Sequence, residues 1–125
     1  MIRDGRIAAV GPSAEVKSPR ISRSVTVINC NGRIVTAGFW NSHVHFTEDI
    51  WKNAAGADPA QLKEHMQAML TRWGFTTVFD TASFIANTNA LRGFVNGGKI
   101  PGPRIFTVGE PLYPKNGIPV YVGPE

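Results

Sequence analysis

The sequence is poor in cysteine and lacks long apolar runs. Cys30 is the only cysteine among 125 residues, so no disulfide can form within the chain and a thiolate metal site is not indicated. We expect Cys30 to pack as a small buried apolar residue. No apolar run approaches the roughly 18 residues that cross a bilayer, and the first residues are too polar for a signal-peptide core. The default expectation is a cytoplasmic protein with no membrane segment.

The charges show no clustering either. Thirteen Lys and Arg residues against nine Asp and Glu give a net charge of +4, but the basic residues are scattered from Arg3 to Lys115. A nucleic-acid or membrane surface would need a basic run or stripe, so neither partner is expected. The length suits one small domain, or part of one, acting on a small-molecule substrate.

The first 38 residues have the pattern of short antiparallel strands. Asp4-Gly5 and Asn31-Gly32 are two-residue turn signals of the kind that join hairpin strands. Apolar and β-branched residues flank both turns, including residues 24–28 and 33–36. Four short strands are therefore predicted up to about Thr36.

After Gly38 the pattern changes to alternating strands and helices, which is typical of βα units around a parallel sheet. Strands are predicted at residues 39–46, 75–79 and 104–108, and a weaker helix at residues 89–95. The proline-rich segment from Glu110 to Glu125 is predicted to be a loop.

The strongest helix signal lies between the first two of these strands. Asp58 is placed as an N-cap, Pro59 as the first helical residue and Gln61 as a capping-box residue, while Gly74 suits the C-terminal end. The predicted helix spans residues 59–73. Its inward face is expected to contain five apolar residues, with His65 exposed on the other side: Leu62, Met66, Met69, Leu70 and Trp73.

One local motif could perform chemistry. His43 and His45 flank Val44 at the end of the first predicted parallel strand. On a strand, side chains at i and i+2 project from one face, about 7 Å apart along the chain, so both imidazoles can reach one metal ion. Barrel active sites lie at the carboxyl ends of the strands, and His43 and His45 occupy such an end.

Four segments resemble the amidohydrolase superfamily, in the same order along the chain, and imidazolonepropionase-like members most of all. They cover nearly the whole sequence: Asp4–Gly11, Val35–Phe46, Trp73–Thr81 and Gly98–Ile105. The resemblance implies an α/β fold, with residues 1–38 forming part of an N-terminal β-sandwich. Residues 39–125 would form the first three βα units of a (β/α)8 TIM barrel, which takes about 250 residues in full.

The resemblance also implies a function and its cofactor. In that family the histidines matching His43 and His45 bind a divalent metal, usually zinc, with one or two ions in a complete site. The metal activates water for attack on a carbonyl carbon, so carbon-nitrogen bonds other than peptide bonds are hydrolysed. The family's remaining ligands are a lysine, two histidines and an aspartate, which would lie beyond Glu125. The isolated chain is therefore expected to bind zinc weakly and to be inactive.

Some positions depart from the family pattern or have an open role. Many members have proline in place of Ala37 and aspartate in place of Asn41, although neither change removes a ligand. Glu48 and Asp80 are candidates for outer-shell partners of the histidines. The competing and preferred interpretation of Asp80 is that it caps the turn after its strand, and the competing interpretation of Glu48 is a solvated loop residue. Members usually have further strands before the Asp4-Gly5 segment, which suggests Met1 as an internal start.

Two other hypotheses compete with the enzyme. A cupin-type β-barrel also binds metal through a His-x-His motif, but Glu48 follows His45 too closely and a capped helix comes next. Alternatively the chain is a non-catalytic fragment or a weak metal-binding module, with open barrel edges that promote self-association. The tryptophans could line a pocket, although such aromatic residues more often belong to the core: Trp40, Trp51 and Trp73.

Overall fold

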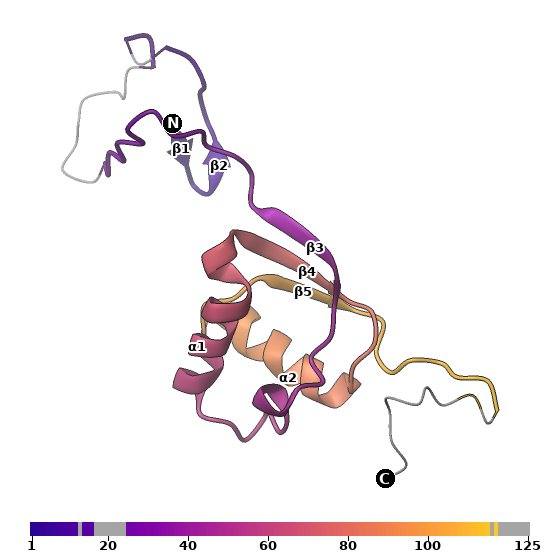
Figure 1. The fold of residues 1–125 in the computed structure, drawn as a ribbon. Coiled ribbons are helices and arrows are strands. Elements are labelled where there is room, and N and C mark those ends of the chain that lie inside the picture. Colours follow the sequence, from indigo (N-terminus) through magenta and orange to yellow (C-terminus); the bar gives the residue numbers. More distant parts are fainter. Residues whose placement is uncertain (13, 17–24, 116, 118–125) are drawn as a thin grey trace. The chain divides into compact units, whose positions relative to one another are not determined.

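A computed structural model describes residues 1–12, 14–16, 25–115 and 117 (Figure 1). The chain divides into two compact units, Met1–Val35 and Thr36–Glu125, and each is described by itself. The assignment of residues 1–38 to a β-sandwich and of residues 39–125 to a barrel stays a prediction.

The first unit begins with the predicted hairpin. Strands β1 (Ile2–Arg3) and β2 (Arg6–Ile7) pair antiparallel. The turn between them has positive φ angles at both central residues, 50° at Asp4 and 70° at Gly5. This is the backbone of a type I′ turn, which matches the right-handed twist of paired strands. The first turn prediction is confirmed.

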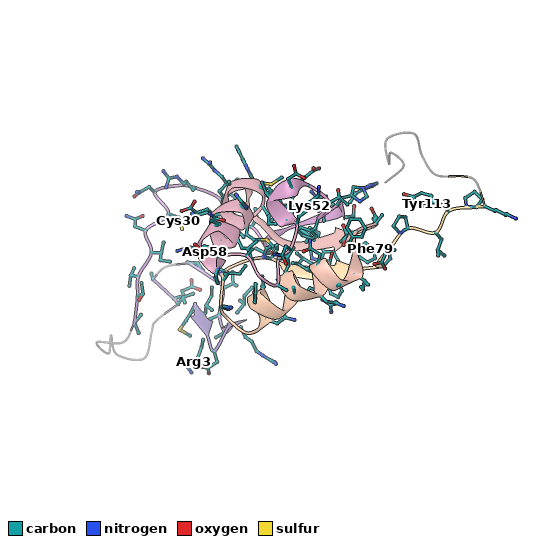
Figure 2. All side chains as sticks on the ribbon, turned by 90° about the horizontal axis from the view of Figure 1, so that it is seen from below. Arg3, Cys30, Lys52, Asp58, Phe79 and Tyr113 are labelled. Carbon is teal, nitrogen blue, oxygen red and sulfur yellow. The ribbon has the colours of Figure 1, made fainter. Side chains whose placement is uncertain are left out.

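The second turn forms, but the strands predicted around it do not. Asn31 and Gly32 have φ angles of 47° and 77°, and the Arg33 amide donates to the Cys30 carbonyl at 2.9 Å. Residues 25–28 and 33–36 are nevertheless not strands. Their apolar side chains are exposed, and a two-stranded ribbon without a covering layer is only marginally stable in water. Cys30 itself is half-buried rather than buried (Figure 2).

The second unit contains a parallel three-stranded sheet, as the alternating pattern predicted. Its strands are β3 (Phe39–Val44), β4 (Phe75–Asp80) and β5 (Arg104–Thr107), hydrogen-bonded in that order. The first strand ends at Val44, two residues earlier than predicted. Gly38, just before β3, is required by close packing, because a Cβ there would overlap the Thr76 side chain on β4.

Two helices cover one face of this sheet. Helix α1 (Pro59–Met69) connects β3 to β4, and α2 (Ile85–Asn96) connects β4 to β5 (Figure 1). Right-handed crossovers between strands in sequential order place both helices on the same side. The core lies between them and the sheet: it includes Leu62, Met66, Val78, Leu91 and Ile105. No helix in the described part of the chain is both long and apolar enough to cross a bilayer.

The start of α1 is as predicted, whereas its end is not. The Asp58 side chain accepts a hydrogen bond from the Ala60 amide at 2.9 Å, which confirms the N-cap. The α-helix ends at Met69, and a 3-10 turn, η2 (Thr71–Trp73), precedes Gly74, whose φ is 84°. Trp73 lies in this tighter turn and is 62% exposed instead of facing the core. Met69, the last residue of the α-helix, is 47% exposed as well.

The two methionines of α1 provide a matched test of this packing. Met66 is fully buried, whereas Met69 is 47% exposed one turn later. Met66→Ala is expected to lower the free energy of unfolding by about 2–4 kcal/mol, because it leaves a cavity in the core. Met69→Ala should change it by about 0.5 kcal/mol or less. Urea denaturation followed by circular dichroism measures both, and equal losses would show that α1 packs through a different face.

The opposite face of the sheet carries no helix among the described residues. Trp40 on β3 is 60% exposed and stacks on Phe106 of β5, with ring centroids 5.7 Å apart. A parallel sheet with helical crossovers is not the antiparallel double sheet of a cupin, so the cupin alternative has no support in this fold.

Candidate metal site

The two histidines of the motif lie against each other at the carboxyl end of β3. Both side chains are exposed, and their rings meet edge to face with centroids 5.0 Å apart. The Nε2 atoms of His43 and His45 are 3.1 Å apart. The i, i+2 spacing therefore brings both imidazoles to one point, even though His45 follows the last strand residue, Val44.

A backbone carbonyl fixes the proton of His45. Its Nδ1 atom lies 2.8 Å from the carbonyl oxygen of Ala82, in the loop after β4. A carbonyl can only accept, so Nδ1 must be the protonated nitrogen and, in the neutral ring, Nε2 carries the lone pair. His43 then donates from its own Nε2 to His45 Nε2. This contact leaves His45 in the tautomer that a metal ion requires.

The nitrogen pair fits a metal of the zinc type. Two ligands at about 2.0–2.1 Å from zinc in tetrahedral geometry are about 3.3 Å apart. The observed 3.1 Å between the Nε2 atoms is close to that value, and both rings are accessible. Within residues 1–12, 14–16, 25–115 and 117, no group of three or more His, Cys, Asp or Glu side chains could complete the coordination.

Asn41 supports the strand end that carries the motif. Its Oδ1 atom accepts a hydrogen bond from the His43 amide at 3.1 Å. A carboxylate at this position could accept the same bond, so the change from the family's aspartate keeps the backbone contact. Asn41 and His45 also line a small pocket of about 230 Å³.

Asp80 is fully buried and accepts four hydrogen bonds from neutral donors. Its Oδ1 atom accepts from Ser83 Oγ at 2.7 Å and from the Ala82 amide at 3.2 Å. The Oδ2 atom accepts from the hydroxyls of Thr88 on α2, at 3.0 Å, and Thr107 on β5, at 2.9 Å. Asp80 thus holds the turn after β4 and joins three elements. This arrangement agrees with the turn-capping interpretation.

The structure gives Glu48 no comparable position. Its side chain is exposed, and its carbonyl accepts from the Trp51 amide in the short turn η1 (Asp49–Trp51). The neighbouring Asp49 pairs with Lys52 at 2.6 Å, and the hydrogen bond from the ammonium lowers the pKa of the Asp49 carboxyl. His45 is oriented by the Ala82 carbonyl instead. An outer-shell role for Glu48 stays a prediction.

The third histidine packs against Trp51, which is the one tryptophan of the three that is buried; Trp40 and Trp73, also expected in the core, are 60% and 62% exposed. His65 was expected to be exposed but is half-buried, with its ring edge-on to Trp51 at 5.8 Å and its Nδ1 atom buried without a partner. Trp51 is a core residue, only 1% exposed. His65 faces the core because η1 folds back onto α1, which helical periodicity alone does not predict.

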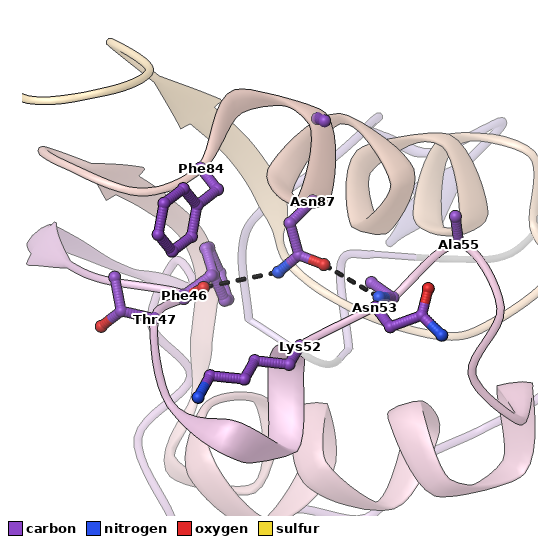
Figure 3. Close-up of a pocket in the computed structure, with 9 residues that line it drawn as sticks. Phe46, Thr47, Lys52, Asn53, Ala55, Phe84 and Asn87 are labelled. Atoms are coloured by element: carbon purple, nitrogen blue, oxygen red, sulfur yellow. Dashed lines mark hydrogen bonds between the residues drawn. The ribbon is translucent and has the colours of Figure 1, made fainter. Parts of the chain in front are cut away.

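A second and larger pocket, of about 310 Å³, lies between the loop after β3 and the start of α2 (Figure 3). Asn87 spans its wall: its Oδ1 accepts from the Ala54 amide at 2.8 Å, and its Nδ2 donates to the Phe46 carbonyl at 3.4 Å. Neither His43 nor His45 lines this pocket. Asn87 therefore ties down the residue that follows His45 rather than contributing to the metal site directly.

Comparisons with known proteins bear on the reaction class of the protein to which this chain belongs. No protein-family model matches the chain. Similar proteins include two adenine deaminases. The one from Desulforamulus reducens is 30% identical over 94 residues, and the one from Paracoccus denitrificans is 30% identical over 92 residues. The chain is similar to part of an adenine deaminase. Both matches cover 74% of this chain, which spans only 13% of the length of each relative.

These relatives support the superfamily and no finer assignment. An adenine deaminase cleaves a carbon-nitrogen bond, which agrees with the resemblance carried by the sequence motifs. The more specific likeness to imidazolonepropionases is not supported by these matches.

Proposed function

We propose that this chain forms part of a metal-dependent hydrolase that cleaves a carbon-nitrogen bond other than a peptide bond. His43 and His45 would provide two of the ligands of a divalent metal, with zinc as the first candidate. The observation that carries the proposal is the pair of Nε2 atoms 3.1 Å apart, with the lone pair of His45 Nε2 fixed by the Ala82 carbonyl. A bound metal of this type supplies an activated water as nucleophile.

The chain's own residues would perform distinct tasks at such a site. The contact from His45 Nδ1 to the Ala82 carbonyl keeps one ligand nitrogen deprotonated. His43 must move its proton from Nε2 to Nδ1 before it can bind, because both Nε2 atoms cannot otherwise face one ion. Asn41 holds the His43 backbone in place through its amide oxygen. Preorganisation of this kind keeps ligands in position before the metal arrives.

The substrate class is inferred from the relatives and not from the metal site. The relatives are adenine deaminases, so the carbon-nitrogen bond of an aminopurine is the first candidate, followed by a cyclic amide as in imidazolonepropionases. Substrate choice in βα barrels is made largely by the loops after the strands, of which this chain contains few.

For the chain alone we expect weak zinc binding and no hydrolysis. Only two ligands meet in the described residues, and activation of water depends on a complete coordination set. This observation also favours a second candidate, a weak metal-binding module without catalysis. Zinc titration and an ammonia-release assay with adenine test the expectation. Micromolar or tighter zinc binding together with turnover by the 125-residue chain would contradict it.

The hydrolase proposal is tested by reading the gene in frame past Glu125. The expected result is a continuation that encodes a strand-borne lysine, two histidines and an aspartate, and a protein product that releases ammonia from adenine or opens a cyclic amide. A stop codon directly after Glu125 would contradict a hydrolase made of one chain, and would leave a pseudogene remnant, a split enzyme or a binding fragment to be distinguished.

A further inference from the structure

We propose that Ser83, held by Asp80, is a positioning residue that sets the tautomer and place of His45. This inference deepens the metal site and rests on the proposed function where metal affinity is concerned. Asp80 and Ser83 do not contact His45 themselves; they act through the backbone of the loop after β4 and of Phe46.

The first part of the connection runs through Ala82. Asp80 Oδ1 accepts a hydrogen bond from the Ala82 amide at 3.2 Å. This contact holds Ala82, the residue whose carbonyl faces His45. That carbonyl accepts from His45 Nδ1 at 2.8 Å. If the loop moved, the carbonyl would leave Nδ1, and either nitrogen of the exposed ring could then carry the proton.

The second part runs through Ser83 to the residue after the histidine. Ser83 is 2% exposed, and its hydroxyl donates to Asp80 Oδ1 at 2.7 Å while accepting from the Phe46 amide at 2.7 Å. Asn87 donates to the Phe46 carbonyl at 3.4 Å (Figure 3). With the Ser83 contact, both backbone groups of Phe46 are held. The ring of His45 and the backbone beside it are thus tied to one loop.

The hydroxyls around Asp80 provide a matched pair of variants. Ser83→Ala removes one hydrogen bond to Asp80 and the contact with Phe46, whereas Thr88→Val removes one hydrogen bond to Asp80 on the α2 side only. Both residues are fully buried, but Ser83→Ala also leaves the Phe46 amide without its acceptor, so it should lower the urea midpoint more than Thr88→Val does. They differ in whether they touch the connection to His45.

The experiment measures the His45 tautomer and zinc affinity of the 125-residue chain. Long-range ¹H–¹⁵N NMR at mildly alkaline pH, without metal, should show a protonated Nδ1 in the wild type and in T88V, and a mixture of tautomers in S83A. Zinc affinity should fall about tenfold in S83A and less than about twofold in T88V. If S83A does not fold, S83C, whose thiol is a weaker donor and acceptor than the hydroxyl, should show smaller changes in the same direction.

Each alternative result has a defined meaning. A wild-type His45 protonated at Nε2 would overturn the inference, as would an S83A or S83C variant with wild-type tautomer and zinc affinity. Equal effects of S83A and T88V on the His45 tautomer and on zinc affinity would overturn the inference too, because they would reflect general destabilisation. If S83A shows the expected change of tautomer but the wild-type chain binds no zinc, the positioning role of Ser83 is supported and the metal site is refuted.

Discussion

Asp80→Ala is expected to lower the free energy of unfolding of the second unit by at least about 3 kcal/mol. The carboxylate is completely buried and accepts four hydrogen bonds, from the Ala82 amide and the hydroxyls of Ser83, Thr88 and Thr107. Truncation leaves these donors without their acceptor in the core, and each buried unsatisfied donor costs about 1–3 kcal/mol. Urea denaturation followed by circular dichroism measures the loss.

Two comparisons separate the effect from a general response to losing a carboxylate. Asp58→Ala removes an exposed carboxylate that accepts one hydrogen bond, from the Ala60 amide, and should cost about 1 kcal/mol. Asp80→Asn keeps the side-chain shape and one oxygen, and the hydroxyls can rotate to accept from its amide, so its loss should be smaller than that of Asp80→Ala. A loss for Asp80→Ala no larger than that for Asp58→Ala would contradict the role assigned to the buried carboxylate.

Replacing either histidine of the motif should weaken zinc binding by at least about tenfold, and replacing both should abolish it. With only two ligand nitrogens meeting among the described residues, each alanine substitution leaves a single imidazole. His65→Gln is the matched control, since His65 faces Trp51 and should leave the affinity unchanged. Isothermal titration calorimetry compares the zinc affinity of the wild type with that of the two single variants, the double variant and His65→Gln. A larger loss of affinity in His65→Gln than in the His43 and His45 variants would move the site to α1.

Local signals in the sequence predicted much of the fold. The turn at Asp4-Gly5 and the cap at Asp58 are each decided by a few neighbouring residues, and both are confirmed. The parallel sheet followed from the alternation of strand and helix patterns. The predictions that failed depend on tertiary context. Residues 33–36 have strand-like composition but lack a covering layer, and the 3-10 turn η2 rotates Trp73 away from the core.

The same distinction holds for the candidate site. The spacing of His43 and His45 was sufficient to predict that their rings meet. The partner of His45, however, is a backbone carbonyl 37 residues later, and carbonyls have no sequence signature. Ser83 and Asn87 were missed for the same reason, because their contacts with Phe46 arise only when the loop after β4 packs beside the loop after β3. The strand-end position of Asp80 was its only visible signal.

In the proposed site, His43 and His45 together bind one metal ion through their Nε2 atoms. The most direct test is a zinc titration of the ¹⁵N-labelled chain, followed at the imidazole nitrogens by NMR. We predict that the Nε2 signals of both His43 and His45 move to the range of metal-bound nitrogen at the same zinc concentration. His45 should retain its protonated Nδ1, His43 should gain a protonated Nδ1, and His65 should not change. Zinc bound to only one of these rings, or to His65, would contradict the claim.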